Sequence, residues 1–319
     1  MLDGVFCLAA VFGPIIVQAA QAALFECVFF MTISVIIPTL NAGTQLEALL
    51  RSLEGQTVCP DEIIIVDSQS QDSTVSIASA HPLVRVIPIQ RSEFDHGGTR
   101  DLALRQSAGD LVLFMTQDAL PTDEHYIEHL AAPFADERIA AAGGRQIAYP
   151  HARPFEKAVR AYNYPENDRV WSAADITRLG VRAYLISDVC SAYRRSAYLA
   201  AGGFDHPIMT NEDMLMAQKL LDAGHCLAYC GSASVYHSHH FTLKQEYKRN
   251  RLIGWTMKHY EERFAHAEEM GEGVKLAVNV VKSLLRQGHV WECVPFAFNC
   301  AARLLGNRAG RRAAGKEMA

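Results

Sequence analysis

Four short apolar runs that alternate with helical segments constrain the fold of this chain more than any other feature. The runs are 33-ISVII-37, 62-EIIIV-66, 83-LVRVIPI-89 and 111-LVLFM-115. Nearly continuous apolar strands of this kind are typical of a sheet that is covered on both faces. Between them, apolar residues recur at helical spacing in Thr44–Glu54, Asp72–Ala80 and Thr99–Ala108, with Asp72 and Thr99 as candidate N-caps. The alternation predicts an α/β fold with a mostly parallel central sheet flanked by helices.

Polar residues that follow the predicted strands are the candidates for a ligand site, because open parallel sheets bind ligands beyond the carboxyl ends of their strands. These segments are Pro38–Asn41, Asp67–Asp72, Phe94–Arg100 and Thr116–Asp118. A dinucleotide fold or a P-loop is excluded, since one glycine follows the first strand and no G-x-x-x-x-G-K-[ST] occurs. Asp67, at the tip of a buried strand, could accept a hydrogen bond from the N3–H of a pyrimidine ring or cap the following helix.

Composition limits the classes of partner. The 319 residues carry a formal net charge of −5 at pH 7, whereas nucleic-acid-binding domains are usually strongly basic. No nucleic-acid partner is therefore expected. The eight cysteines are scattered along the chain, which is unlike a disulfide framework and indicates a reducing compartment.

Several short motifs, taken in chain order, resemble one enzyme family. They are 35-VIIPTLNAG-43, 65-IVDSQSQDST-74, Asp118 after a buried strand, 202-GGFD-205 and 211-NED-213. Together they are similar to the family 2 inverting glycosyltransferases. Within that family, 94-FDHGGTRD-101 and 116-TQDA-119 resemble bacterial rhamnosyltransferases that use dTDP-L-rhamnose. The resemblance spans residues 32–241 and implies a Rossmann-like GT-A fold over residues 31–241, with a helical C-terminal appendage.

The resemblance implies a role for each matching residue. Those assigned to the nucleotide sugar are Pro38, Thr39, Asn41, Asp67, Ser70, Asp95, His96, Gly97, Arg100, Gln117 and Asp118. Asp213 is implied as the catalytic base, with Glu212 beside it. An inverting transfer needs one such base to deprotonate the acceptor hydroxyl as it attacks the anomeric carbon. Two carboxylates in the first turn of a helix would also suit an ordinary capping role.

Asp118 is further implied to hold a divalent metal, Mg²⁺ or Mn²⁺, that bridges the donor diphosphate. Many members of the family have two or three acids here, whereas this chain has Thr116 and Gln117 before Asp118. Mg²⁺ often takes only one or two carboxylates and completes its shell with phosphate oxygens and water. Histidine also serves Mn²⁺, so His239 is the predicted second ligand and His237 the next, both from 237-HSHH-240. The alternative is that these histidines are merely polar residues at a strand end.

The loop 95-DHGGT-99 could act on the donor in two ways. Its glycines would let backbone approach phosphate, with N–H groups of the following helix and the Arg100 cation nearby. Asp95 and His96 could instead bind sugar hydroxyls. A tight turn explains Gly97 and Gly98 equally well, so these interpretations stay open.

Both ends of the chain depart from its average composition. Residues 4–25 contain no charged side chain, and residues 1–30 are predicted to be an extension upstream of Met31, with a membrane anchor as the alternative. Residues 242–319 are predicted to be helical. Within them, residues 275–316 hold eight Lys or Arg and one acid, which favours peripheral contact with an anionic membrane over packing on the chain's own domain.

The predicted activity is transfer of a sugar, L-rhamnose from dTDP-L-rhamnose, to a saccharide or lipid-linked saccharide acceptor in cell-surface polysaccharide synthesis. The excursion Arg153–Trp171 is expected to contact the acceptor, together with Tyr184. The expected location is cytoplasmic, at the inner face of the cell membrane, since nucleotide sugars are made on that side. Two alternatives remain: a UDP-hexose donor on the same fold, and a non-catalytic nucleotide-sugar-binding scaffold at the membrane.

Overall fold

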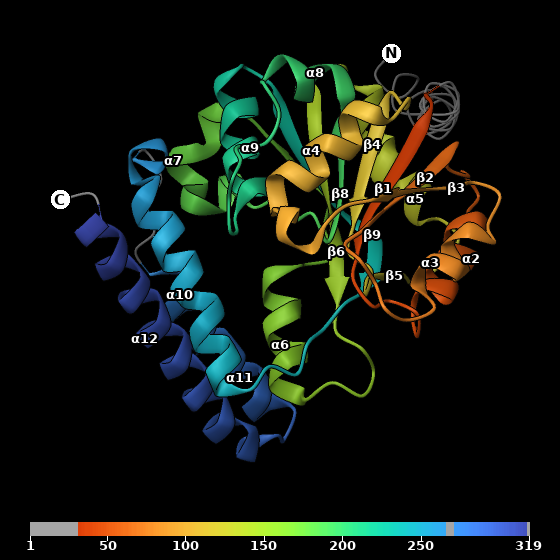
Figure 1. Cartoon of the computed structure of the whole chain (residues 1–319). Coiled ribbons are helices and arrows are strands. Elements are labelled where there is room, and N and C mark those ends of the chain that lie inside the picture. The colour runs from red at the N-terminus through yellow and green to blue at the C-terminus, as the bar shows by residue number, and fades with distance from the viewer. Residues whose placement is uncertain (1–30, 266–270, 318–319) are drawn as a thin grey trace, which may run out of the picture.

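A nine-stranded sheet forms the centre of the computed structural model, which describes residues 31–265 and 271–317 (Figure 1). The predicted extension, residues 1–30, lies outside the described residues. The strands are β1 (Ile33–Thr39), β2 (Glu62–Asp67), β3 (Val84–Pro88), β4 (Leu111–Met115), β5 (Leu120–Pro121), β6 (Ile139–Ile147), β7 (Arg169–Trp171), β8 (Cys190–Arg194) and β9 (Cys226–Tyr236).

The strand order confirms the predicted mostly parallel sheet. The order is β3-β2-β1-β4-β8-β6-β9-β5, with β7 paired on β9. Strands β1 to β4 are parallel. Strand β8 inserts antiparallel between β4 and β6, and β9 returns parallel to β6. Six of the nine described strands therefore run in one direction, and their carboxyl ends share one edge.

Helices cover both faces of the sheet, as the apolar runs predicted (Figure 1). One layer contains α2 (Leu46–Glu54), α3 (Thr74–Ser79) and α5 (Tyr126–Ala131). The other contains α4 (His96–Gln106), α8 (Arg195–Ala200) and α9 (Glu212–Asp222), with the short α7 (Ile176–Leu179) beside α9. Alternate residues of β1 enter separate cores: Val35 and Ile37 pack with α2 and α5, and Ile36 packs with α4 and α9.

Two predicted N-caps were wrong by a few residues. Helix α4 begins at His96, because the Asp95 carboxylate accepts the N–H of Gly98 at 2.6 Å, so Thr99 lies inside the helix. Helix α3 has Ser73 at its N-cap. Asp72 lies one position earlier, where it accepts the N–H of Thr74 at 3.0 Å. In both cases an aspartate ahead of the helix provides the acceptor, which propensity alone places only approximately.

Three C-terminal helices lie at the lower left in Figure 1. They are α10 (Leu243–His259), α11 (Glu272–Arg286) and α12 (Cys293–Glu317). Helix α11 packs on α6 (Pro154–Asn163), and α10 packs along α12. A capping box of Thr242 and Gln245 opens α10. No helix among the described residues is long and apolar enough to cross a membrane.

Helices α10 and α12 approach closely because glycine stands at their contacts. A Cβ atom on Gly310 would lie 1.9 Å from the carbonyl oxygen of Arg251, and one on Gly306 would lie 2.3 Å from that of Tyr247. Both obstacles are backbone atoms, which cannot move aside as a flexible side chain can. The helix pair therefore depends on the missing side chains.

We expect Gly310→Ala to destabilise the protein, although alanine normally stabilises a helix interior by about 0.5–1 kcal/mol relative to glycine. Overpacking of this kind costs roughly 1–3 kcal/mol, which a fall in the melting temperature would report. Gly315→Ala is the matched control on the same helix, since nothing lies within 4 Å of its added Cβ. Equal effects of the two substitutions would contradict this account of the contact.

Candidate active site

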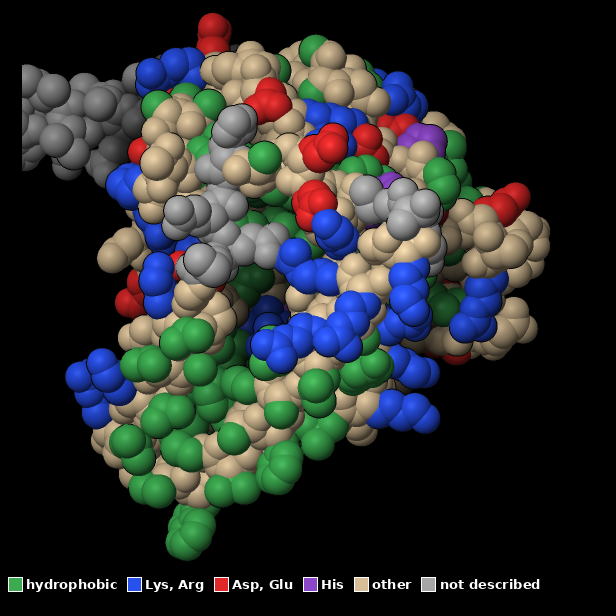
Figure 2. All heavy atoms as spheres, turned by 90° about the vertical axis from the view of Figure 1, so that its left-hand side faces the viewer, with side chains coloured by type: hydrophobic (Ala, Val, Ile, Leu, Met, Phe, Trp, Pro, Cys, Tyr) green, Lys and Arg blue, Asp and Glu red, His purple; other side chains and the backbone are tan. Residues whose placement is uncertain are grey.

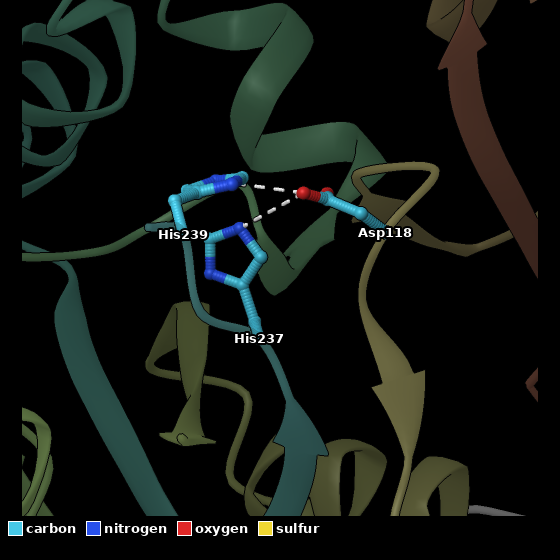
Figure 3. Close-up of side chains that lie close together, drawn as sticks. All are labelled: Asp118, His237 and His239. Atoms are coloured by element: carbon cyan, nitrogen blue, oxygen red, sulfur yellow. Dashed lines mark ion pairs between the residues drawn. The ribbon is translucent and has the colours of Figure 1, made fainter. Parts of the chain in front are cut away.

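Asp118, His237 and His239 form a compact cluster at the carboxyl edge of the sheet (Figure 3). Asp118 follows β4, and the two histidines follow β9. Their Nε2 atoms lie 3.5 and 3.4 Å from the Asp118 Oδ2. One ligand atom from each residue falls within 4.8 Å of the other two. The predicted trio is thus brought together by the fold, in a geometry that could hold one metal ion.

The hydrogen bonds behind His237 support metal binding. Its Nδ1 lies 2.9 Å from the Oε1 of Gln146, and Arg160 also donates to that oxygen. Because Gln146 Oε1 only accepts, a neutral His237 carries its proton on Nδ1. Its Nε2 lone pair then faces the Asp118 carboxylate with no proton between them. A metal-ligating histidine is held in this way, by an acceptor on its other ring nitrogen.

Protonation states in this cluster also suit a cation. Burial raises the pKa of the Asp118 carboxyl, but its interactions with His237, Thr116 and His239 together outweigh burial and hold that pKa well below the usual range. Burial lowers the pKa of His237, and burial together with His237 lowers the pKa of His239 to about 4. At neutral pH the site therefore offers one carboxylate and two neutral imidazoles, which are the forms that coordinate metals.

A cavity of about 440 Å³ lies at the ends of β1, β2 and β4. Nine of its lining residues belong to the predicted ligand segments: Pro38, Thr39, Leu40, Ser68, Phe94, His96, Arg100, Thr116 and Gln117. Gln117 joins two of its walls, since its side-chain amide accepts from the N–H of Leu40 at 2.8 Å and donates to the carbonyl of Leu40 at 3.2 Å. The cavity has the position expected for a nucleotide.

Hydrogen bonds beside this cavity join the segment after β1 to the segment after β2, through Asn41, Asp67 and Ser70. Asp67 is only 3% exposed, and its carboxylate accepts from Thr39 and from the backbone and hydroxyl of Ser70. Ser70 in turn accepts the N–H of Asn41 at 2.8 Å. Asp67 therefore bonds within the loops after β1 and β2, whereas the first N–H of α3 is accepted by Asp72; the role of Asp67 toward a pyrimidine stays a prediction.

The start of α4 is tied to other elements of the protein. Asp95 accepts the N–H of Ile208 at 2.6 Å, in addition to that of Gly98. A Cβ on Gly97 would lie 2.4 Å from the Asp205 carbonyl oxygen, so close backbone packing requires this glycine. Arg100 is buried and donates to the Glu212 carboxylate at 3.2 Å. His96 lies at the surface of the cavity, with half of its side chain exposed.

Glu212 and Asp213 open α9 at the wall of a larger cavity of about 530 Å³. Glu212 is paired with Arg100, whereas Asp213 forms its hydrogen bond with the N–H of Met214 at 2.8 Å. Burial, and then the charges of Glu212 and Asp188, raise the pKa of Asp213 well above its ordinary value. A carboxyl held in this state is a strong proton acceptor once ionised. His96, Arg100 and Thr116 line both cavities, which places the two side by side.

Asp188 completes this carboxylate group and was not predicted from the sequence. It is buried just before β8, accepts from Ser191 at 2.7 Å and Tyr193 at 2.9 Å, and lies 3.8 Å from Arg100. Burial raises its pKa to about 6; Arg100 opposes the increase and Glu212 adds to it. The signal available was one acid directly before a buried strand, which alone indicates no chemistry.

Two arginines of the C-terminal helices also line the larger cavity and were not predicted as site residues. Arg249 comes from α10 and Arg303 from α12. Among the described residues, neither forms an ion pair with a carboxylate. Both also line a neighbouring cavity of about 180 Å³ that reaches His239. Unpaired guanidinium groups beside a candidate metal site can bind phosphate.

The excursion expected to contact an acceptor borders the same region. Arg169, Val170 and Trp171 line a further cavity of about 240 Å³, and this cavity shares Tyr229 with the larger one. Tyr184, by contrast, is 2% exposed and packs against Phe264, so it offers no surface to a ligand in this structure.

Comparison with known proteins identifies a family and two similar relatives. Residues 34–200 match the family described as Glycosyl transferase family 2. The O-antigen chain rhamnosyltransferase RfbN of Salmonella typhimurium is 35% identical, over 88% of this chain and 90% of the relative. The O-antigen chain rhamnosyltransferase WbaN of Salmonella anatum is also 35% identical, over 87% and 89%.

Solved structures support the fold. The mannosyltransferase of Pyrobaculum calidifontis, in complex with GDP-Man and Mn²⁺, superposes with a TM-score of 0.58 at 18% identity, over 98% of this chain and 88% of that one. Staphylococcus aureus TarS residues 1–349, in complex with UDP-GlcNAc, superpose with a TM-score of 0.52 at 19% identity, over 90% and 92%. At such identities the likeness concerns the fold alone.

Proposed function

The chain belongs to glycosyl transferase family 2, and on that premise we propose that it transfers L-rhamnose from dTDP-L-rhamnose to a saccharide acceptor. We take the transfer to invert the anomeric centre and to serve polysaccharide synthesis, with a lipid-linked saccharide as the acceptor. The choice of sugar is supported by the two rhamnosyltransferase relatives, which match over most of their length. It is also supported by the motifs Phe94–Asp101 and Thr116–Ala119.

The observation that carries the proposal is the position of Asp213 in the larger cavity, beside the smaller cavity at the ends of β1, β2 and β4. A donor bound in the smaller cavity would extend past His96, Arg100 and Thr116 into the larger one, where Asp213 lies. An acceptor held near Trp171 and Tyr229 would approach from the other side. Asp213 can then take the proton of the acceptor hydroxyl as its oxygen attacks the anomeric carbon, and the nucleoside diphosphate leaves from the opposite face.

Glu212, Arg100 and Asp188 hold the base in place. Arg100 forms an ion pair with Glu212, so Asp213 is the one of these two neighbouring carboxylates to which no cation is bonded. The negative charges of Glu212 and Asp188 beside Asp213 favour the state in which it has gained a proton. These neighbours are positioning residues, and Asp213 acts on the substrate.

The leaving diphosphate needs positive charge. Asp118, His237 and His239 would hold the divalent metal, which when bound supplies Lewis-acid stabilisation of the diphosphate oxygens. Arg249 and Arg303, which lack carboxylate partners among the described residues, would add two charges from the C-terminal helices. The chain's shortage of acids before Asp118 is thus offset by two histidines and two arginines.

Turnover of a donor panel by the purified full-length protein tests this proposal. We expect release of dTDP from dTDP-L-rhamnose when Mn²⁺ and a lipid-linked saccharide acceptor are supplied, and little release from other dTDP-sugars or UDP-hexoses. Nuclear magnetic resonance of the product should show an anomeric configuration opposite to that of the donor. Preferential turnover of a UDP-hexose would instead support the alternative donor. Donor binding without turnover for every acceptor would support a non-catalytic scaffold.

A further inference from the structure

Large apolar side chains are exposed along α11, the turn Val290–Glu292 and α12, and we call this surface the apolar face. Its members are Val274, Val278 and Leu285 on α11, Val290 and Trp291 in the turn, and Val294, Phe298 and Leu305 on α12. Their exposed fractions range from 46% at Val278 to 88% at Trp291. Figure 2 shows hydrophobic side chains gathered over this end of the molecule, with Lys and Arg side chains along the border above them. A contiguous exposed apolar surface of this kind indicates an interaction site.

The apolar face is separate from the core that holds the helices to the protein. On α11, Val280 and Leu284 are buried and pack with Phe155 of α6, whereas Val274 and Val278 are exposed. The exposed residues recur at four- and seven-residue steps, so they share one side of the helix, and the buried pair lies on another. On α12, Phe296 is buried in the same way between exposed Val294 and Phe298. Folding therefore uses one apolar stripe of each helix and leaves a second in water.

Positive charge borders the apolar face. Lys282 and Arg286 of α11 are exposed beside it, and Arg308 and Arg312 continue the exposed stripe of α12 beyond Leu305. Residues 275–316 contain eight Lys or Arg and one acid, Glu292. Glu292 is itself paired with Arg153 at 3.2 Å. The border is therefore cationic, with no free acid of this segment to offset it.

We propose that the apolar face is the surface by which the protein binds an anionic lipid bilayer, with α11 and α12 lying in the headgroup region and Trp291 inserted. Amphipathic helices with large apolar residues on one face and Lys or Arg beside them bind bilayers in this orientation. A second copy of the chain fits the surface less well. A twofold interface would bring the same cationic border against itself, and like charges in contact repel.

In this proposal the C-terminal helices connect the bilayer to the candidate active site, whichever sugar is transferred. The same helix α12 that exposes Phe298 carries Arg303 on the side facing the larger cavity. A bilayer beneath the apolar face would therefore lie one helix away from the candidate active site. This position suits an acceptor whose saccharide is attached to a lipid.

Co-sedimentation of the full-length protein with vesicles tests the proposal. One set of vesicles contains phosphatidylethanolamine and phosphatidylglycerol, and the other phosphatidylcholine alone. We expect binding to the anionic vesicles that weakens as salt is raised. The double variant Trp291→Ser with Phe298→Ser should bind them at least about tenfold more weakly, because both lost side chains would otherwise insert. Val75→Ser, which removes an exposed apolar side chain from α3, is the matched control and should bind like the unaltered protein.

Two further measurements keep the result decisive. The melting temperature of each variant shows that binding was not lost through unfolding, and light scattering without lipid reports the oligomeric state. The proposal is overturned if the unaltered protein stays in the supernatant with anionic vesicles, or if the double variant sediments equally well. It is also overturned if the unaltered protein is a dimer that the double variant converts to monomers without any lipid binding. Every variant contains residues 1–30, so these residues cannot cause a difference in lipid binding between the variants.

Discussion

Asp213→Asn should reduce the turnover number of sugar transfer by about a thousandfold while leaving donor binding nearly unchanged. General-base catalysis contributes roughly 10²–10⁴-fold, and an amide cannot accept the hydroxyl proton. Asparagine retains the shape of the side chain and the oxygen that accepts the N–H of Met214, so the start of α9 should stay intact. Steady-state kinetics with saturating donor and acceptor measures the loss, and nucleotide binding by calorimetry reports the donor site.

Control variants and pH dependence separate the role of Asp213 from that of a structural carboxylate. Asp222→Asn, at the exposed end of the same helix, should leave turnover unchanged. Because burial and the neighbouring carboxylates raise the pKa of Asp213, the base is ionised only above that raised value. Turnover should therefore increase with pH, with its midpoint above the ordinary aspartate pKa of about 3.9, and this limb should vanish in Asp213→Asn. Full turnover by Asp213→Asn would rule out its role as the base.

The sheet could be predicted from the sequence because its strands are buried on both faces. Runs such as Ile33–Ile37 and Leu111–Met115 have nearly all of their side chains in one of the two cores, so the apolar pattern is continuous and easily recognised. The boundaries of α3 and α4 were less accurate, since their first turns depend on which nearby aspartate caps them. The roles of the site residues were predicted from the family resemblance, whereas the apolar pattern predicted only the strands they follow.

Residues of the site were predictable where they adjoin a strand end and less so where their role depends on packing. Asp118 and the histidines follow β4 and β9, and these strand ends meet at one edge of the sheet. Arg100 was one possible cation for phosphate; its position between Glu212 and Asp188 could not be predicted, because that environment depends on β8 and α9. Arg303 lies in a C-terminal helix that no motif connects with the site, so only the folding of α12 against α10 brings it to the cavity.

Removal of divalent metal should abolish transfer, with a loss of at least about a thousandfold, and Mn²⁺ should restore it better than Mg²⁺. The physical reason is the donor set: two neutral imidazoles and one carboxylate suit a transition metal, whereas Mg²⁺ prefers oxygen ligands. The experiment treats the enzyme with EDTA, removes the chelator and titrates each metal while dTDP release is followed. Binding of Mn²⁺ is measured separately, by electron paramagnetic resonance without any donor.

His239→Ala is the sharper form of this test, because His240 beside it offers a matched control. His239 lies 3.4 Å from Asp118, whereas His240 pairs with Glu156 at 3.0 Å and stands outside the cluster. We expect His239→Ala to weaken Mn²⁺ binding by at least about tenfold, as losses around metal sites commonly do, and His240→Ala to leave it unchanged. Unaltered Mn²⁺ binding by His239→Ala would remove this histidine from the site. Full turnover after EDTA treatment would instead assign the diphosphate charge to Arg249 and Arg303, which line the cavity beside His239.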